Sequence, residues 1–147
     1  MPRSAAWRLS PDAYPHTAPV QTRFQDLDVL GHINNVAFAA LFETGRTRFN
    51  REAMLWGREA NGRRAVVAHM EINYLAEGHF PADVEVATGI GEIGNRSWQI
   101  LSLMSQGGQP LATCDVTIVM DKDEHGNGLP GAFKAGLARW RMRGEAQ

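Results

Sequence analysis

Five polar residues that could take part in hydrolysis lie close together in the sequence: Asp26, Asp28, His32, Asn34 and Asn35. A carboxylate can attack a carbonyl carbon or take a proton from water. The residues that follow Asn35 have helical periodicity, so this cluster precedes a helix N-terminus, where unpaired N–H groups carry partial positive charge. A substrate carbonyl placed there would be polarised by the helix and reached by Asp28.

The same residue types are also common in loops that have no catalytic role. Asp and Asn side chains bond to nearby backbone groups and therefore recur in turns and helix caps. On composition alone, a structural loop in which Asn34 or Asn35 caps the helix remains an open alternative.

The helix that positions this cluster is indicated by a bulky apolar stripe. We expect it to end near Trp56-Gly57, after about five turns, because a glycine often follows a helix. Gly45 lies on the stripe, which suggests that another backbone approaches it closely. The stripe recurs at steps of three and four residues and comprises Phe38, Leu41, Phe42, Gly45, Phe49 and Ala53.

The remaining elements are predicted to be strands and one short helix. A strand is expected at 20–24, before the loop, and Pro130 is expected to open a final helix that carries Phe133, Leu137 and Trp140. Gly107-Gly108 indicates a hairpin turn. The other strands are expected at 66–74, 84–90, 97–105 and 111–120. Short links between them predict an antiparallel sheet packed on the long helix, an α+β fold.

The composition is that of a single globular domain. The chain has 147 residues, 44% of them hydrophobic, and a formal net charge of −1. We assign residues 1–18 to an N-terminal arm and residues 19–147 to the domain. The mixed charges argue against a nucleic-acid partner, and the apolar runs are too short for a membrane span. With Cys114 as its one cysteine, a cytoplasmic protein is expected.

The segment from Arg23 to Phe38, RFQDLDVLGHINNVAF, is followed by Glu43 and Arg46. It resembles the signature of hotdog-fold thioesterases, in the branch named for 4-hydroxybenzoyl-CoA thioesterase. That signature has two aspartates, a glycine and a helix with an aromatic residue in its first turn. The resemblance implies a hotdog fold, in which a five-stranded antiparallel sheet wraps around one long helix.

The resemblance also implies an activity, the hydrolysis of acyl-CoA thioesters to free acid and CoA. Asp28 matches the catalytic carboxylate, which acts as nucleophile or as general base, and the backbone N–H of Asn35 matches the oxyanion donor. No metal or other cofactor is implied, since CoA is part of the substrate. Members form homodimers or homotetramers whose active site is shared between subunits joined edge to edge.

Other substrate-binding residues are predicted on the same grounds, each with an alternative. His32 is expected to order the loop or line the substrate rather than act as a base with Asp28. Glu43 either lines the acyl pocket or forms an exposed pair with Arg46. Arg96 and Ser97 resemble the family's basic-Ser-aromatic step, which would meet the CoA phosphates; a solvated turn arginine is the alternative.

The other polar residues are predicted to be structural. His69, Glu71 and Asn73 share one strand face, which indicates a solvent face or a dimer interface rather than a metal site. Asp26 is expected to bond loop amides or Arg23. Cys114 alternates with small apolar residues and is interpreted as a core residue. The remaining histidines are interpreted as surface residues: His16, His79 and His125.

Two further functions are compatible with the sequence. The chain could be an acyl-carrier-protein thioesterase or a hotdog dehydratase, although the spacing of Asp28 and His32 does not suit the latter. It could also be a module that binds acyl-CoA without turning it over. Acyl-CoA hydrolysis is the leading hypothesis.

Overall fold

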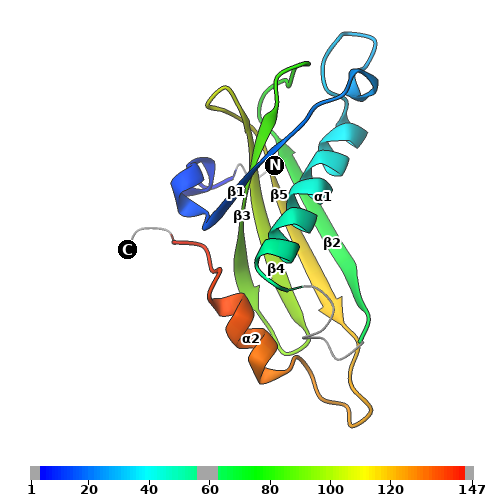
Figure 1. The fold of residues 1–147 in the computed structure, drawn as a ribbon, viewed down its shortest axis with the longest axis vertical. Helices are drawn as coiled ribbons and strands as arrows, with labels where there is room; N and C mark the ends of the chain where they lie inside the picture. The colour runs from blue at the N-terminus through cyan, green and yellow to red at the C-terminus, as the bar shows by residue number, and fades with distance from the viewer. Residues whose placement is uncertain (1–3, 56–62, 145–147) are drawn as a thin grey trace.

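The computed structural model describes residues 4–55 and 63–144, and its ribbon is shown in Figure 1. The long helix α1 (Asn35–Glu52) lies across one face of an antiparallel sheet, and the short helix α2 (Gly131–Ala138) packs against β3. The strand order is β1-β3-β4-β5-β2. The strands are β1 (His16–Val20), β2 (Ala65–Tyr74), β3 (Val84–Ile93), β4 (Ser97–Gln106) and β5 (Gln109–Met120). The predicted α+β architecture is confirmed.

The apolar stripe of α1 forms the centre of the main core. Phe38, Leu41, Phe42 and Phe49 are all buried, and the helix packs mainly over β1, β3 and β4. Burying each such side chain contributes about 1.5–3 kcal/mol relative to leaving it exposed. The helix ends at Glu52, earlier than expected, and positions 56 and 57 lie outside the described residues.

The predicted hairpin between β4 and β5 is present. Gly107 and Gly108 have φ values of 58° and 81°, in the left-handed region that glycine adopts without steric cost. The two strands pair from Gln106 opposite Gln109 to Ser97 opposite Val119. The sheet is therefore continuous across its centre.

The first strand lies earlier than predicted. The strand expected at 20–24 is instead β1, and the chain leaves the sheet after Val20 to form a 3-10 turn over Phe24–Asp26. His16, Ala18 and Val20 alternate as the buried face. Pro19 is tolerated because β1 is an edge strand, where a missing N–H breaks no ladder bond.

His16 is consequently a buried residue, not the surface residue that was predicted. It is 8% exposed, and its ring packs edge-on against Phe49 and Trp140. Its Nε2 pairs with the Glu52 carboxylate at the end of α1. The sequence prediction placed His16 in a loop, and a loop carries no inward-facing alternation.

Residues 4–14, which the sequence analysis assigned to an arm, cover the outer face of the sheet, which is the face opposite α1. Two 3-10 turns, Ala6–Leu9 and Pro11–Ala13, carry Arg8 and Tyr14 onto that face. Arg8 is buried; its Nη2 donates to Asp115 Oδ1 at 2.7 Å and its Nε to the Tyr14 hydroxyl at 2.9 Å. The first strand also begins within the assigned arm.

At Gly45, α1 lies close against the sheet. A Cβ there would lie 2.4 Å from Val86 Cγ1 and 2.7 Å from Val86 Cβ, so the close neighbour is a side chain rather than the expected backbone. We predict that Gly45→Ala lowers the free energy of unfolding by about 1–3 kcal/mol, because overpacking a core costs that much. Denaturant titration measures the loss.

The adjacent exposed residue supplies a control for this test. Thr44→Ala should change stability by no more than about 0.5 kcal/mol. The Gly45→Ala loss should also shrink in a Val86→Ala background, since trimming Val86 removes both γ-carbons. An unchanged loss in that background would show that the γ-carbons of Val86 are not the obstacle.

Cys114 is confirmed as a core residue and is only 1% exposed. Burial raises the pKa of its thiol to about 11, which leaves little thiolate near neutral pH. We predict that a disulfide-exchange reagent at pH 8 does not label Cys114 in the folded protein but labels one thiol per chain after unfolding. Stoichiometric labelling of the folded protein would contradict this. Assays that detect released thiol should then carry no background from Cys114.

Candidate active site

The loop that precedes α1 is closed by its own backbone. Leu27 and Ile33 form an antiparallel bridge. Between them the Asp28 N–H donates to His32 O at 2.8 Å, and the Gly31 N–H donates to Asp28 O at 3.0 Å. Gly31 has a φ of 80°, which a side chain at this turn would oppose. The loop thus holds Asp28 at a fixed place before the helix.

Asn34 is the N-cap of α1, as expected. Its Oδ1 accepts from the Ala37 N–H at 2.8 Å, and its own N–H and Nδ2 both donate to Asp26 O, at 2.8 and 2.9 Å. The buried Asp26 carboxylate accepts from Arg23 N and Nη2, each at 2.9 Å. No hydrogen bond from the Asn35 N–H is found within the described residues, so the cap leaves that donor free for a ligand.

The Asp28 side chain is held by two amides. Its Oδ1 accepts from the N–H groups of Leu30 at 2.9 Å and His32 at 3.2 Å. Among the described residues, Oδ2 has no hydrogen-bond partner. One oxygen therefore orients the carboxylate while the other is available to a water or a substrate carbon.

Asp28 and Asn35 line the same open pocket, of about 450 Å³. Phe38 of α1 and Tyr74 at the end of β2 meet edge-on with ring centroids 5.3 Å apart, and the Tyr74 hydroxyl lies 3.5 Å from Asn35 O. Sequence reasoning missed Tyr74 and Glu77, because they lie far from the motif and only the pairing of β2 places them there. The remaining lining residues are Leu30, His32, Ile33, Asn34 and Ala76.

His32 lines this pocket, but its ring is paired with a different carboxylate. Its Nε2 lies 3.1 Å from Glu77 Oε2, and its ring packs edge-on against His79 at 5.3 Å. Only its backbone N–H reaches Asp28. These contacts favour the loop-ordering role over that of a general base.

Glu43 does not line the pocket. Its side chain is 73% exposed, and its Oε2 lies 4.0 Å from Arg46 Nη2. Two alternatives were predicted for Glu43, lining the acyl pocket or pairing with Arg46. The single chain shows the i, i+3 pair with Arg46. Arg46 is the buried member of that pair.

Arg96 and Ser97 lie at the opposite end of the sheet. Arg96 Nε donates to Met120 O at 3.2 Å, and Met120 pairs with Ala65, whereas Tyr74 of the pocket is at the other end of β2. The nine steps from Ala65 to Tyr74 extend about 30 Å at about 3.3 Å per residue. One chain therefore does not bring Arg96 to Asp28.

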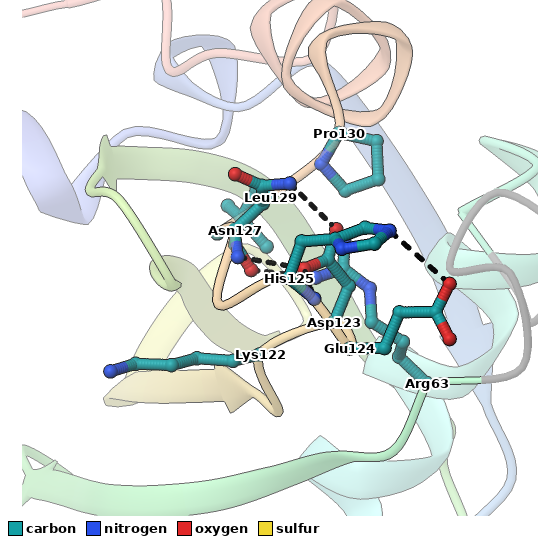
Figure 2. A pocket seen from close by; sticks show the side chains of 9 residues that line it. Arg63, Lys122, Asp123, Glu124, His125, Asn127, Leu129 and Pro130 are labelled. Atoms are coloured by element: carbon teal, nitrogen blue, oxygen red, sulfur yellow. Dashed lines mark hydrogen bonds and ion pairs between the residues drawn. The ribbon is translucent and has the colours of Figure 1, made fainter.

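A second, larger pocket of about 590 Å³ occupies that distant end. Figure 2 shows its side chains, including Arg63, Lys122 and His125. Asp123 is already satisfied there: its carboxylate accepts from Asn127 N at 2.7 Å and Nδ2 at 3.0 Å and from His125 N at 2.9 Å. The bond from the Asn127 backbone is the main reason that the pKa of Asp123 is lowered. The pocket is thus lined by the cations Arg63 and Lys122 and by two acids, Asp123 and Glu124.

Two other kinds of site are absent from the described part of the chain. No helix there is both long and apolar enough to cross a membrane. No group of three His, Cys, Asp or Glu side chains there could hold a metal ion.

Comparison with known proteins identifies the family. The family model of the thioesterase-like superfamily matches residues 22–140, which include the loop, α1 and the whole sheet except β1. No curated protein matches the sequence closely enough to count as a relative.

Solved structures share the fold over most of the chain. A thioesterase from Thermus thermophilus, solved with coenzyme A and zinc, is 28% identical with a TM-score of 0.74, covering 86% of this chain and 95% of its own. A predicted thioesterase from Bacillus stearothermophilus is 27% identical with a TM-score of 0.74, covering 88% and 98%.

A solved structure of lower sequence identity has the same fold. It is a 1,4-dihydroxy-2-naphthoyl-CoA thioesterase from Synechocystis, 16% identical with a TM-score of 0.72, covering 83% of this chain and 94% of its own. At this identity the likeness concerns the fold alone. Together with the family match, the sheet and helix described above place the chain in the thioesterase-like superfamily, with a hotdog fold.

Proposed function

We propose that the protein hydrolyses acyl-CoA thioesters to the free acid and CoA. The observation that carries the proposal is that the Asp28 carboxylate and the free N–H of Asn35 line one pocket at the N-terminus of α1. The thioester carbonyl oxygen would accept from the Asn35 N–H. The oxygen of a water deprotonated by Asp28, or an oxygen of the Asp28 carboxylate itself, then adds to the carbonyl carbon, the C–S bond breaks, and CoA leaves as a thiolate that takes up a proton. In the second route the product is an acyl-Asp28 anhydride, which a water must hydrolyse to release the free acid.

The helix contributes to the stabilisation that this step needs. Charge develops on the carbonyl oxygen as the tetrahedral intermediate forms, and α1, with 18 residues, directs its positive end at that position. A single preorganised donor of this kind contributes about 2.7–4 kcal/mol to catalysis. Asp28 would act either by attacking the carbon itself or by taking a proton from the attacking water; both routes use the same free oxygen.

CoA recognition is proposed to require a second copy of the chain. β2 is a ten-residue edge strand that exposes Val66, Val67, Met70 and Tyr74, and an unpaired edge of this kind favours pairing with another strand. A two-fold axis at the middle of β2 would place the Arg96 end of one subunit beside the Asp28 pocket of the other. Arg96, Ser97, Arg63 and Lys122 could then meet the CoA phosphates.

The catalytic role of Asp28 has a direct test. Asp28→Asn keeps the size and the amide contacts but removes the base or nucleophile, so turnover of acyl-CoA esters should fall by at least about 100-fold with an unchanged thermal unfolding midpoint. Released thiol is the readout. Asp83→Asn, at an exposed position outside the pocket, should retain activity. Full activity in the Asp28 variant would refute the assignment.

The proposed dimer has its own test. Wild-type protein should sediment at twice the 16.2 kDa chain mass, or at four times that mass if dimers pair. Met70→Lys should shift it towards monomer, because like charges facing across paired strands are destabilising. Thr17→Lys, which alters the other edge strand, should leave the assembly intact. A Met70→Lys protein that remains dimeric would exclude β2 as the interface.

A further inference from the structure

Two acids line the pocket at the N-terminus of α1, Asp28 and Glu77. Glu77 follows the last residue of β2 by three positions, and the hydrolysis proposed above gives it no chemical step. Its Oε2 lies 3.1 Å from His32 Nε2. Because a carboxylate only accepts, this contact is attractive when Nε2 carries the ring proton, whether or not His32 is charged. Glu77 thus holds the side chain of a residue in the Asp28 loop.

His32 is bonded to Asp28 through both of its backbone groups. Its carbonyl accepts from the Asp28 N–H at 2.8 Å, and its N–H donates to Asp28 Oδ1 at 3.2 Å. The second bond is the longer of the two that orient the carboxylate, since the Leu30 N–H donates at 2.9 Å. Bonds of this type span about 2.7–3.2 Å, so a small displacement of His32 would break it. The position of His32 therefore controls how the Asp28 carboxylate is held.

The segment after β2 contacts the Asp28 loop at three successive residues. Glu77 reaches His32 Nε2, and the His79 ring packs edge-on against the His32 ring with centroids 5.3 Å apart. Between these two contacts, Gly78 O accepts from the Ile33 N–H at 2.9 Å. The backbone bond joins the two segments, and the two side-chain contacts fix the His32 ring between them.

The segment that carries Glu77 is itself bonded to the sheet on both sides. Gln106, the last residue of β4, accepts from the His79 N–H at 2.9 Å and donates to His79 O at 2.7 Å and to Ala82 O at 3.0 Å. Before Glu77, the Ala76 N–H donates to Leu111 O at 3.2 Å. Glu77 therefore extends from backbone that β4 and β5 hold in place.

Burial does not account for the presence of Glu77. Its side chain is 66% exposed, so its removal takes little surface out of packing. The next residue differs, because a Cβ at Gly78 would lie 2.8 Å from Ile33 Cδ1. The fold depends on a small residue at position 78, whereas position 77 can be changed without filling or emptying the core.

We propose that Glu77 is a positioning residue for Asp28 and acts through His32. The inference rests on the proposed function for the catalytic role of Asp28. The contact with Glu77 restricts the His32 side chain and so keeps the His32 N–H against Asp28 Oδ1, while Oδ2 remains available to the reaction. A contact between partly exposed groups changes an equilibrium by at most about 5-fold. The effect of Glu77 on turnover should be of that size, well below the effect of Asp28 itself.

Turnover of hexanoyl-CoA, followed by released thiol, tests the proposal. Glu77→Ala should lower kcat about 3–5-fold, with KM and the thermal unfolding midpoint unchanged. Glu77→Gln retains an acceptor oxygen for His32 Nε2 and should recover at least about half of the wild-type kcat. Glu85→Ala, the same change at an exposed position of β3, should keep the wild-type kcat. A wild-type kcat in Glu77→Ala protein would overturn the proposal.

A double variant tests whether Glu77 acts through His32. His32→Ala removes the ring but keeps the backbone N–H that donates to Asp28. In that background Glu77→Ala should cause no further loss of kcat, because residues that act as one unit give non-additive losses. A second loss of about 3–5-fold in the double variant would show that Glu77 acts on the reaction by another route and would overturn the proposal.

Amide hydrogen exchange separates this inference from the proposed function, since it needs no substrate. The His32 N–H should exchange about 3–5-fold faster in Glu77→Ala protein than in wild type, and at the wild-type rate in Glu85→Ala protein. A lower kcat without faster exchange at His32 would show that Glu77 acts on the substrate and would overturn the positioning role. Faster exchange in a protein that releases no thiol from straight-chain or aromatic acyl-CoA esters would support the positioning of Asp28 and overturn the hydrolysis.

Discussion

The hydrogen bonds between Asp26 and Asn34 fix the positive end of α1 relative to Asp28. The Asp26 carbonyl accepts both the backbone N–H and the side-chain Nδ2 of Asn34, and the same asparagine caps the helix at Ala37. Asp28 follows two residues after Asp26 and is tied into the same closed loop. A carboxylate and a helix dipole held this way need no rearrangement as charge develops, which is the condition for effective electrostatic stabilisation.

Core packing, rather than hydrogen bonding, fixes the other wall of the pocket. Gly45 lets α1 descend onto Val86 of β3, and this close contact sets the height of the helix above the sheet. Phe38, two turns earlier, then meets Tyr74 at the end of β2. The distance between the donor at Asn35 and the strand wall thus follows from the volume of side chains in the core, which is close-packed and yields little.

The sequence predicted the local features well, because local chemistry determines them. The long helix, the cap at Asn34, the glycine hairpin and the four later strands all follow from periodicity and turn residues. The features that it missed depend on pairing across the sheet. His16 was misplaced because residues 1–18, which hold three prolines, show no sustained periodicity. Tyr74 and Glu77 reach the pocket because β2 runs antiparallel to β5. Pairing of this kind brings together residues far apart in sequence, so spacing alone does not reveal it.

Because one chain holds Arg96 and Asp28 at opposite ends of β2, the proposed CoA site requires a second chain paired through this edge strand. In the proposed dimer each end of β2 would carry part of the site: the pocket with Asp28 at Tyr74, and the cations around Arg63 near Ala65. In a monomer these two ends lie about 30 Å apart, at about 3.3 Å per strand residue. That distance is too large for one chain to hold the thioester and the phosphates of the same compactly bound CoA ester. If two copies of β2 pair antiparallel, the Ala65 end of each strand lies beside the Tyr74 end of the other. One symmetric interface would therefore complete two sites at once.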